Sequence, residues 1–509
     1  MYHYIVPPLE RLPGVLPLIR QRQYFVIHAA RQTGKTTYLQ HLVKHLNHEG
    51  TYYTAYCPLE AAQAFTEPKE GIVQIFNLLT FSIQHSGLPH SSDFGKNINP
   101  LKTAIAIKAA LTDYCRLLDK PFVLLFDEVD ALKNGTLITF LRQLREGYIT
   151  RSTIPFPHSI ALVGMRNIRD YKSLIGDDRQ TLGSASPFNI VTKTFTLGNF
   201  NMEEVKALYQ LHTNATGQVF EPAAVEKVLD FSNGQPWLVN ALANEITSEI
   251  LHNDHTQPIT PDLVEQAAQN IMLRRDTHLD SLLDKLKEER VRKVIEPMLT
   301  GDLAQHILSD DTQYCLDLGL IKISKVGLEP ANRIYSEVII RALTFDLQFS
   351  LERQVQNTWV TPKGELDMDG LLKAFQQFWR KNSEIWKEKF EYKEAAPQLI
   401  LQAFLQRIVN GGGRIDREYG LGRGRTDLYV QWHHASGTQR EVIELKVLRY
   451  SLEKTIETGM QQTAAYMDKC GADTGHLLIF DRRPGISWEE KIFHHSKSFQ
   501  GRTMEVWGC

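Results

Sequence analysis

One stretch near the N-terminus indicates the fold most clearly: Phe25-Val-Ile-His-Ala-Ala-Arg-Gln-Thr-Gly-Lys-Thr-Thr37. Its apolar start, Tyr24–His28, predicts a buried strand, and the residues from Tyr38 to Leu46 predict a helix with one apolar face. Between them, a loop ending in Gly-Lys-Thr can turn its backbone N–H groups inwards around a phosphate at the helix N-terminus. Ala29 replaces the first glycine of the usual GxxxxGK[ST] pattern. The stretch therefore predicts a phosphate-binding loop.

Each residue type in this loop has a chemical reason to be there. Gly34 lets the backbone approach the phosphates, Lys35 can reach the β and γ oxygens, and Thr36 can place its hydroxyl on Mg²⁺. The predicted cofactors are ATP and Mg²⁺. The predicted nucleotide-binding residues of the loop are Ala30, Arg31, Gln32, Thr33, Gly34, Lys35, Thr36 and Thr37.

A second phosphate-handling element follows about ninety residues later. Phe122–Phe126 is a continuous apolar run, typical of a strand buried in a parallel sheet, and it ends in Asp127 and Glu128. Acids at this strand end lie at the ligand-binding edge of such sheets. We expect Asp127 to hold Mg²⁺ through water and Glu128 to polarise the attacking water. The alternative is a pair of solvated acids at the start of a loop.

A third strand, Ser159–Gly164, is predicted to lead to a residue that senses the γ-phosphate. Arg166 is the first candidate and Arg169 the second, and the alternative is a surface arginine. Arg142 and Arg145 follow the acidic pair on a predicted helix. They are candidates for action across a subunit interface, with a solvated helix face as the alternative.

Together with the segment Ser232–Leu242, these motifs resemble the AAA+ superfamily, in particular its STAND-like branch of signal-transducing ATPases, over residues 1–345. In that branch a Gly-x-Pro on a helical lid lies near the nucleotide, which implies Gly234 and Pro236 here. The alternative is a helix-start turn with Pro236 at the first helical position. The hh-GRE sequence often found ahead of the loop in that branch is absent from this chain.

The middle of the chain predicts helices and one hairpin. Asn201–Glu204 has the pattern of a helix cap, and helical periodicity continues to about residue 275. Helices over Arg290–Leu299 and Gln313–Leu320, a hairpin from residue 321 to 330, and a closing helix give a winged-helix order. Both packing on the ATPase and DNA contact remain open for this unit. An aromatic stripe in residues 369–392 favours a helical connector.

Near the C-terminus, Val442–Val447 predicts a strand that projects Glu444 and Lys446 onto one face. A polar loop, Gln431–Gln439, separates this strand from the one headed by Asp427, so a hairpin brings Asp427 towards Glu444. Two acids beside a lysine can hold a metal that activates water for attack on a phosphodiester. The alternative is a solvated Glu–Lys pair. Gln462 and Tyr466 lie four apart on a predicted helix, Leu452–Cys470, and can touch substrate or orient Lys446.

This arrangement resembles the PD-(D/E)XK nuclease superfamily, in its branch with a QxxxY helix, over residues 390–485. The resemblance implies Asp427 and Glu444 as metal ligands, with Lys446 positioning water or stabilising the transition state. The acid of the first helix maps to Glu394, with Glu418 as its rival, and Thr426 replaces the proline of the family name. A local positive field for a nucleic-acid backbone is predicted from Arg414, Arg417, Arg423, Arg425 and Arg449.

Composition limits the setting. The formal net charge of -2 favours no polyanion globally, and 5 scattered cysteines suit a reducing cytoplasm. No signal peptide and no apolar run long enough for a membrane is evident, which predicts a cytoplasmic protein with no membrane partner. Nucleic acid, above all DNA, and further copies of the chain through its ATPase part are the expected partners.

The predicted fold class is α/β, with a P-loop parallel sheet, a helical lid, a winged helix and a C-terminal α/β PD-(D/E)XK domain. The predicted domains are an ATPase core (1–200), a lid (201–280), a winged helix (281–348), a connector (349–389) and a nuclease-like domain (390–509). The predicted function is an ATP-controlled, Mg²⁺-dependent deoxyribonuclease, and the architecture associates it with genome defence or mobile elements. The alternative is a nucleotide-switched signalling or scaffold protein whose nuclease domain no longer cuts.

Overall fold

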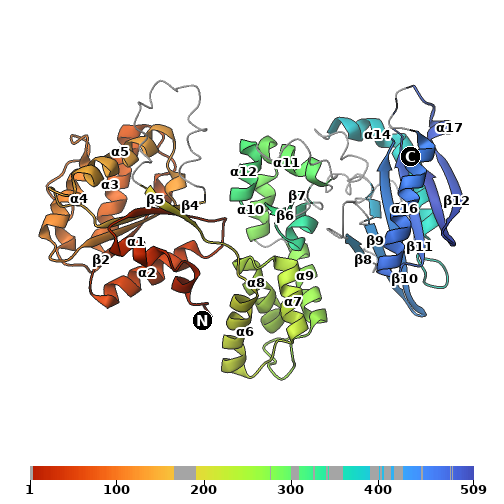
Figure 1. The fold of residues 1–509 in the computed structure, drawn as a ribbon, viewed down its shortest axis with the longest axis horizontal. Helices are drawn as coiled ribbons and strands as arrows, with labels where there is room; N and C mark the ends of the chain where they lie inside the picture. Colours follow the sequence, from red (N-terminus) through yellow and green to blue (C-terminus); the bar gives the residue numbers. More distant parts are fainter. Residues whose placement is uncertain are drawn as a thin grey trace. The chain divides into compact units, whose positions relative to one another are not determined.

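The computed structural model describes residues 4–165, 191–274, 277–299, 309–324, 327–339, 342, 359–389, 401, 404–405, 414–417, 428–448, 451–481, 483 and 485–509. The chain forms two compact units (Figure 1): Met1–Arg274 with Leu316–Leu320, and Arg275–Cys315 with Ile321–Cys509. None of the helices in these described stretches is long and apolar enough to cross a membrane.

The first unit is built on a parallel sheet with the strand order β2-β3-β4-β1-β5 in its described part. The predicted strands at the phosphate loop, before the acidic pair and before Arg166 are confirmed as β1, β3 and β4. The expectation of a P-loop type parallel sheet is thereby also confirmed. The strands are β1 (Tyr24–His28), β2 (Tyr53–Pro58), β3 (Phe122–Asp127), β4 (Ser159–Gly164) and β5 (Val191–Thr196).

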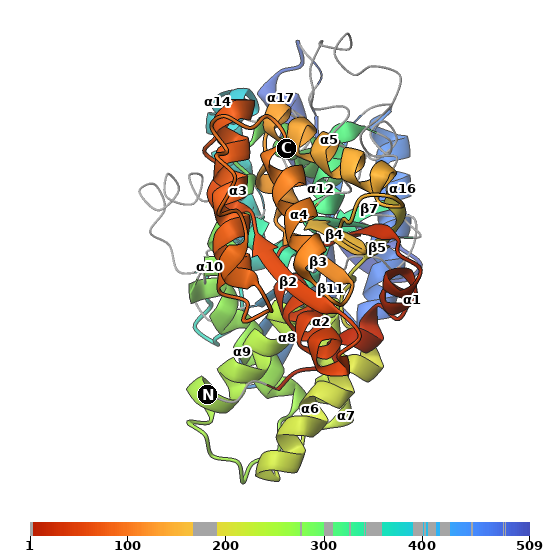
Figure 2. The same cartoon turned by 90° about the vertical axis from the view of Figure 1, so that its left-hand side faces the viewer.

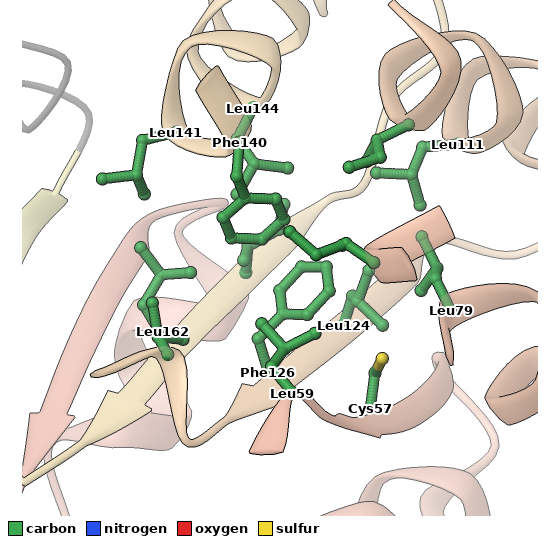
Figure 3. Close-up of a cluster of buried hydrophobic side chains, with 14 of the residues drawn as sticks. Cys57, Leu59, Leu79, Leu111, Leu124, Phe126, Phe140, Leu141, Leu144 and Leu162 are labelled. Atoms are coloured by element: carbon green, nitrogen blue, oxygen red, sulfur yellow. The ribbon is translucent and has the colours of Figure 1, made fainter. Parts of the chain in front are cut away.

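Every residue of β3 is buried because helices cover both faces of the sheet. Leu124 and Phe126 point into one apolar cluster, and Val123 and Leu125 point into another on the opposite face. In the first cluster the rings of Phe126 and Phe140 meet edge to face, with centroids 5.0 Å apart (Figure 3). Burial on both faces explains why this strand is a continuous apolar run in the sequence.

Helices α1 (Val15–Arg20) and α2 (Lys35–Glu49) pack on one face of the sheet. The other face is covered by α3 (Pro68–Gln84), α4 (Ala106–Leu117) and α5 (Asn134–Thr150), which lie side by side (Figure 2). Helix α2 follows Gly34, whose φ of 91° lies in the left-handed region. Its predicted apolar face is confirmed, because Leu39, Leu42 and Leu46 are buried against the sheet.

The first unit also contains a helical segment, residues 202–274, which we call the lid. Its first helix begins with the predicted cap: the Asn201 side chain accepts from Glu204 N, and the Glu204 side chain accepts from Asn201 N. Its helices are α6 (Met202–Thr216), α7 (Pro222–Ser232), α8 (Pro236–Asn244) and α9 (Pro261–Arg274). Between α8 and α9, Glu245–Ile250 forms a π-helical turn.

Gly234 of the lid makes a tight backbone contact with Phe200, in the segment between β5 and α6. Phe200 N donates to Gly234 O at 2.7 Å, and a Cβ on Gly234 would lie 1.9 Å from Phe200 O. Gly234 also has a φ of 70°, which a side chain disfavours. This position therefore requires glycine.

Replacing Gly234 by alanine is expected to lower the free energy of unfolding by about 2–4 kcal/mol, since the new methyl group clashes with backbone and the left-handed φ adds strain. Urea unfolding of the full chain measures the effect. Gly198→Ala, in the segment between β5 and α6 that Gly234 contacts, is the control, because nothing lies within 4 Å of its added Cβ. Equal stability of the two variants would contradict the requirement.

The second unit begins with α10 (Thr277–Lys285), α11 (Glu289–Leu299) and α12 (Asp310–Asp317). The antiparallel hairpin β6 (Ile321–Ser324) and β7 (Gly327–Pro330) follows, and then residues 333–339 are helical. This is the order of helices and hairpin that the sequence predicts.

The described C-terminal strands form one mixed sheet in the order β12-β13-β11-β10-β9-β8. Strands β10 and β11 are parallel, as are β11 and β13, and the other pairs are antiparallel. Helix α16 (Leu452–Cys470) packs across β10 and β11, at its predicted position (Figure 1). The strands are β8 (Arg414–Arg417), β9 (Leu428–His434), β10 (Gly437–Val447), β11 (Thr474–Phe480), β12 (Phe493–Phe499) and β13 (Arg502–Gly508); α17 (Trp488–Lys491) precedes β12.

The predicted polar loop Gln431–Gln439 is wrong. Strand β9 continues to His434 and β10 starts at Gly437, so most of this segment is paired strand. Trp432 is buried between the partly exposed Gln431 and the exposed His433, which is the alternation of a half-buried strand rather than of a loop.

Helix α14 (Met368–Lys389), which the sequence assigns to a connector, supplies core to the C-terminal sheet. Phe375 and Trp379 are buried and contact the ring of Phe480 on β11. Gln376 Nε2 donates to the backbone oxygens of Phe493 and Gly508 at 2.9 and 2.7 Å. The aromatic side chains at this helical spacing form a packing face.

Candidate nucleotide and metal sites

The phosphate loop opens onto a cavity of about 850 Å³, within the size range of roughly 300–1,000 Å³ that suits small-molecule ligands. The predicted loop residues from Arg31 to Thr37 line it, as do Glu128 and Pro236. Ala30 and Asp127 lie beside the cavity, in contact with its lining through Lys35 and Thr36. Further walls come from the N-terminal segment and the lid: Tyr4, Ile5, Val6, Pro8, Arg11, Phe200, Leu208, Trp237 and Asn240.

Lys35 is held at the base of this cavity. Its Nζ donates to the carbonyl oxygens of Ala29 at 2.7 Å and Ala30 at 2.8 Å. Burial lowers the pKa of Lys35, and the carboxylates of Asp130, Asp127 and Glu128 oppose this shift. The ammonium therefore sits among acceptors that phosphate oxygens can replace.

Asp127 gathers three donors at the end of β3. Its Oδ2 accepts from Thr36 Oγ1 at 3.0 Å and from the Tyr56 hydroxyl at 2.9 Å, and its Oδ1 accepts from Glu128 N at 2.9 Å. A hydroxyl and a carboxylate side by side are ligands of the kind that Mg²⁺ prefers. Thr36 and Asp127 are therefore the residues that would hold Mg²⁺, and their geometry fits that role.

Glu128 follows with a φ of 54° and ψ of 42°, a left-handed conformation that is uncommon for glutamate. Burial raises the pKa of Glu128, and the carboxylates of Glu60, Asp127 and Asp130 add to the rise, while Lys35 opposes it. A carboxylate with a raised pKa at a cavity wall is suited to act as a base on water.

Asp130 fixes the end of β4. Its Oδ1 accepts from Met165 N at 3.1 Å, and Met165 lines the cavity. The predicted sensor Arg166 and its rival Arg169 come next and lie outside the described residues. On α5, Arg142 is exposed and Arg145 is half-buried.

A family model described as an AAA-like domain matches residues 17–339 of the chain. The chain belongs to the AAA-like domain family. It is a P-loop ATPase of the AAA-like type, and this family usually binds nucleotide with Mg²⁺. The match begins within α1 of the first unit, which we call the AAA-like unit, and extends to residue 339, in the helix after β7.

Three solved structures that are similar to this chain share 14–15% identity with it. The Walker-type ATPase of Pyrococcus abyssi is 14% identical, with 66% of this chain and 96% of that chain covered and a TM-score of 0.46. The RuvB Holliday junction branch migration motor of Thermotoga maritima is 15% identical, with 65% and 92% covered and a TM-score of 0.34. The ORC1 protein of Aeropyrum pernix in complex with DNA is 14% identical, with 70% and 95% covered and a TM-score of 0.34. No curated protein sequence matches the chain.

A second group of chemically suggestive residues lies on β10. Glu444 is 1% exposed, and its Oε1 forms an ion pair with Lys446 Nζ. Its Oε2 is buried and accepts no hydrogen bond from the described residues. Burial raises the pKa of Glu444, whereas Lys446 opposes the shift. Within the described residues, this buried carboxylate oxygen therefore lacks the hydrogen-bond donor or cation that would stabilise it.

Gln462 and Tyr466 lie on α16, the helix that covers this sheet face. Gln462 Oε1 is also buried and, within the described stretches, accepts no hydrogen bond, and Tyr466 packs on the core beneath the helix. Val442, which shares a strand face with Glu444 by alternation, belongs to that same core. Glu444 and Lys446 therefore lie on the face of the sheet that α16, with Gln462 and Tyr466, covers.

The other acids and the arginines predicted for this site lie mostly outside the described residues. Asp427, Glu394 and Glu418 lie outside the described residues, as do Arg423, Arg425 and Arg449. Of Arg414 and Arg417, the structure describes only the backbone in β8. In the part of the chain that is described, no group of three His, Cys, Asp or Glu side chains is arranged to hold a metal.

Several residues of the nucleotide site have no motif in the sequence. Tyr56, on β2, donates to Asp127. The sequence of this strand, YTAYCP, shows at most the alternation of a strand, which does not by itself mark Tyr56 as part of the site. Arg11 donates to Thr33 O at 3.2 Å, to Gly198 O at 2.5 Å and to Glu204 Oε1 at 3.0 Å. Nothing local marks these residues, because their partners are distant in sequence.

Proposed function

We propose that the AAA-like unit binds ATP in the cavity at the phosphate loop and hydrolyses it. The supporting observation is a single cavity lined by the loop residues Arg31–Thr37, by Glu128 and by Pro236. Apolar walls from Ile5, Val6 and Leu208 offer a slot for a nucleobase, with the Asn240 amide as a polar partner.

In this proposal each chain group has one role. Lys35 exchanges its carbonyl partners for phosphate oxygens, and the loop N–H groups surround the phosphates. Thr36 and Asp127 would hold Mg²⁺, which would supply positive charge beside the phosphates. Glu128 orients the attacking water and accepts its proton.

Glu128→Gln is expected to slow ATP hydrolysis by about 10²–10⁴-fold while ATP affinity changes little, because the amide keeps the shape but takes up no proton. Phosphate release and equilibrium ATP binding measure the two effects separately. Glu49→Gln, at the exposed end of α2, is the control. Hydrolysis at the wild-type rate in Glu128→Gln would remove Glu128 from this role.

We further propose that the second unit is a metal-dependent nuclease acting on DNA, and that the nucleotide state of the AAA-like unit governs it. The observation that carries this proposal is the buried Glu444 Oε2, which has no hydrogen-bond donor among the described residues, on the same strand face as Lys446. A buried carboxylate is costly unless a cation or donor satisfies it. Asp427, Glu444 and Glu394 or Glu418 would hold the metal, which would activate water; Lys446 would stabilise charge on the phosphate.

The test uses the full chain with duplex DNA, single-stranded DNA and RNA, in Mg²⁺ or in EDTA, without nucleotide and with ADP, ATP or a non-hydrolysable ATP analogue. Cutting that requires Mg²⁺ and changes with the nucleotide is the expected result. Sedimentation of the same samples reports whether the AAA-like unit assembles copies of the chain. Intact substrates in every condition would rule out the nuclease.

A nucleotide-switched binding protein is the second candidate. The ion pair between Lys446 and Glu444 favours it, because an internal lysine can neutralise a buried carboxylate without any metal. Calorimetric titration of Mg²⁺ or Mn²⁺ into the full chain in the absence of nucleotide separates the candidates. Binding that Asp427→Asn removes supports the nuclease, and no such binding supports the scaffold.

A further inference from the structure

The backbone carbonyls of the phosphate loop are all held by side chains, from Ala29 to Thr33. Lys35 donates to the first two, and Thr33 Oγ1 also donates to Ala30 O at 2.9 Å. Arg11 donates to the last, Thr33 O. The two in the middle, Arg31 O and Gln32 O, accept from Gln235 Nε2 at 3.4 Å each. Gln235 belongs to the lid, more than two hundred residues further along the chain.

These two bonds control the direction of N–H groups. In a planar trans peptide the carbonyl and the following N–H point to opposite sides. Holding Arg31 O and Gln32 O on the Gln235 side therefore directs the N–H groups of Gln32 and Thr33 away from it. Gln32 also has a φ of 57°, a left-handed conformation that needs support from its surroundings.

Gln235 performs a second task with its other atom. Its Oε1 accepts from Leu238 N at 2.6 Å and so caps the start of α8. The side chain is 5% exposed, and the turn before it is fixed by the contact of Gly234 with Phe200. One amide thus joins a lid helix to the phosphate loop.

We propose that Gln235 is a positioning residue for nucleotide binding, which ties α8 to the phosphate loop and orients the N–H groups of Gln32 and Thr33 for the phosphates. This inference rests on the proposed ATP binding. Because coupling between two elements is reciprocal, bound nucleotide in turn stabilises the docking of α8 on the loop.

Two substitutions separate the tasks of Gln235. Gln235→Glu keeps an acceptor for Leu238 N but loses the donor to the loop carbonyls. Gln235→Met is uncharged and of similar length, and it loses both. Loop positioning predicts that ATP affinity falls about five- to tenfold in both variants, the loss expected for weak neutral hydrogen bonds.

Comparing the ATP affinities of Gln235→Glu and Gln235→Met shows which task of Gln235 supports binding. A fall in Gln235→Met alone indicates that only the cap matters, and a fall in Gln235→Glu alone indicates charge repulsion; either result overturns the inference. Hydrogen exchange of the amides in 238–242, measured with and without ATP, adds a readout, because the change that ATP causes reports the coupling of α8 to the nucleotide rather than stability alone. ATP is expected to protect these amides in the wild type and to protect them less in both variants.

Gln210→Glu and Gln210→Met, at an exposed position on α6, are the matched controls. Melting temperatures are measured for all variants, and Gln235→Glu still provides the test if the uncapped Gln235→Met does not fold. If the wild type binds ATP and both Gln235 variants bind it with the same affinity, the inference about Gln235 is overturned and the proposed ATP binding stands. A wild-type protein that binds no ATP overturns the proposed nucleotide binding as well.

Discussion

Lys35→Ala is expected to weaken ATP binding at least roughly 100-fold, since hydrogen bonds from a charged donor contribute about 1.5–3 kcal/mol each. The ammonium is already at the base of the cavity, with two carbonyl oxygens that phosphates can replace. Without the Lys35 ammonium, the carboxylates of Asp127, Glu128 and Asp130 would repel the negatively charged triphosphate.

Equilibrium binding of ATP and ADP by calorimetry measures the effect, together with the rise in melting temperature on adding nucleotide. Lys44→Ala, an exposed lysine on the same helix, is the control. If the second unit cuts DNA, Lys35→Ala should also remove the dependence of cutting on ATP. Unchanged ATP affinity in Lys35→Ala would show that the cavity does not hold the triphosphate.

Glu444→Gln is the second substitution with a large expected effect. The proposed metal loses a carboxylate ligand, so Mg²⁺-dependent cutting should fall at least roughly 100-fold, as expected when several kcal/mol of charge stabilisation disappear. Plasmid cleavage over time measures it, with Glu457→Gln on the exposed side of α16 as the control. Equal cutting by both variants would exclude Glu444 as a ligand.

The fold should survive Glu444→Gln. The pH dependence of stability distinguishes a loss of cutting caused by the missing ligand from one caused by unfolding. Burial raises the pKa of Glu444 in the folded chain, so folding favours the protonated carboxyl. Its contribution to stability is present at low pH and is lost as pH rises through the raised pKa. Glu444→Gln removes this dependence, so the melting temperature near neutral pH should be equal to or above that of the wild type.

The sequence predicts the phosphate loop and its strands well because their signals are local. Tyr24–His28 and Ser159–Gly164 are strands with the predicted bounds, since apolar runs bounded by polar residues reflect burial on both faces of a sheet. Helix α16 likewise has the predicted bounds, with a serine cap and a closing glycine. Chemistry carried by adjacent residues, such as Asp127 and Glu128, follows from the same local pattern.

Contacts between distant segments could not be predicted in this way. Tyr56 and Arg11 reach Asp127 and the loop from β2 and from the N-terminal segment, and no spacing in the sequence relates them to the loop. Gln235 lies within the Gly-x-Pro that the resemblance places near the nucleotide, but its hydrogen bonds to the loop carbonyls are visible only in the structure. The predicted hairpin of β9 and β10 is confirmed, but its turn is shorter than the polar run Gln431–Gln439 suggests, because most of these residues pair across the two strands. The role of α14 in the C-terminal core has the same origin, since its aromatic side chains find partners far away in the chain.

The walls contributed by Tyr4, Ile5 and Val6 have a practical consequence for biochemists who prepare this protein. A purification tag fused ahead of these residues, or accidental trimming of them by a protease, would alter the mouth of the nucleotide cavity. Measured affinities could then differ between preparations that carry identical motifs. Mass spectrometry of the first residues is therefore worth recording beside every binding constant.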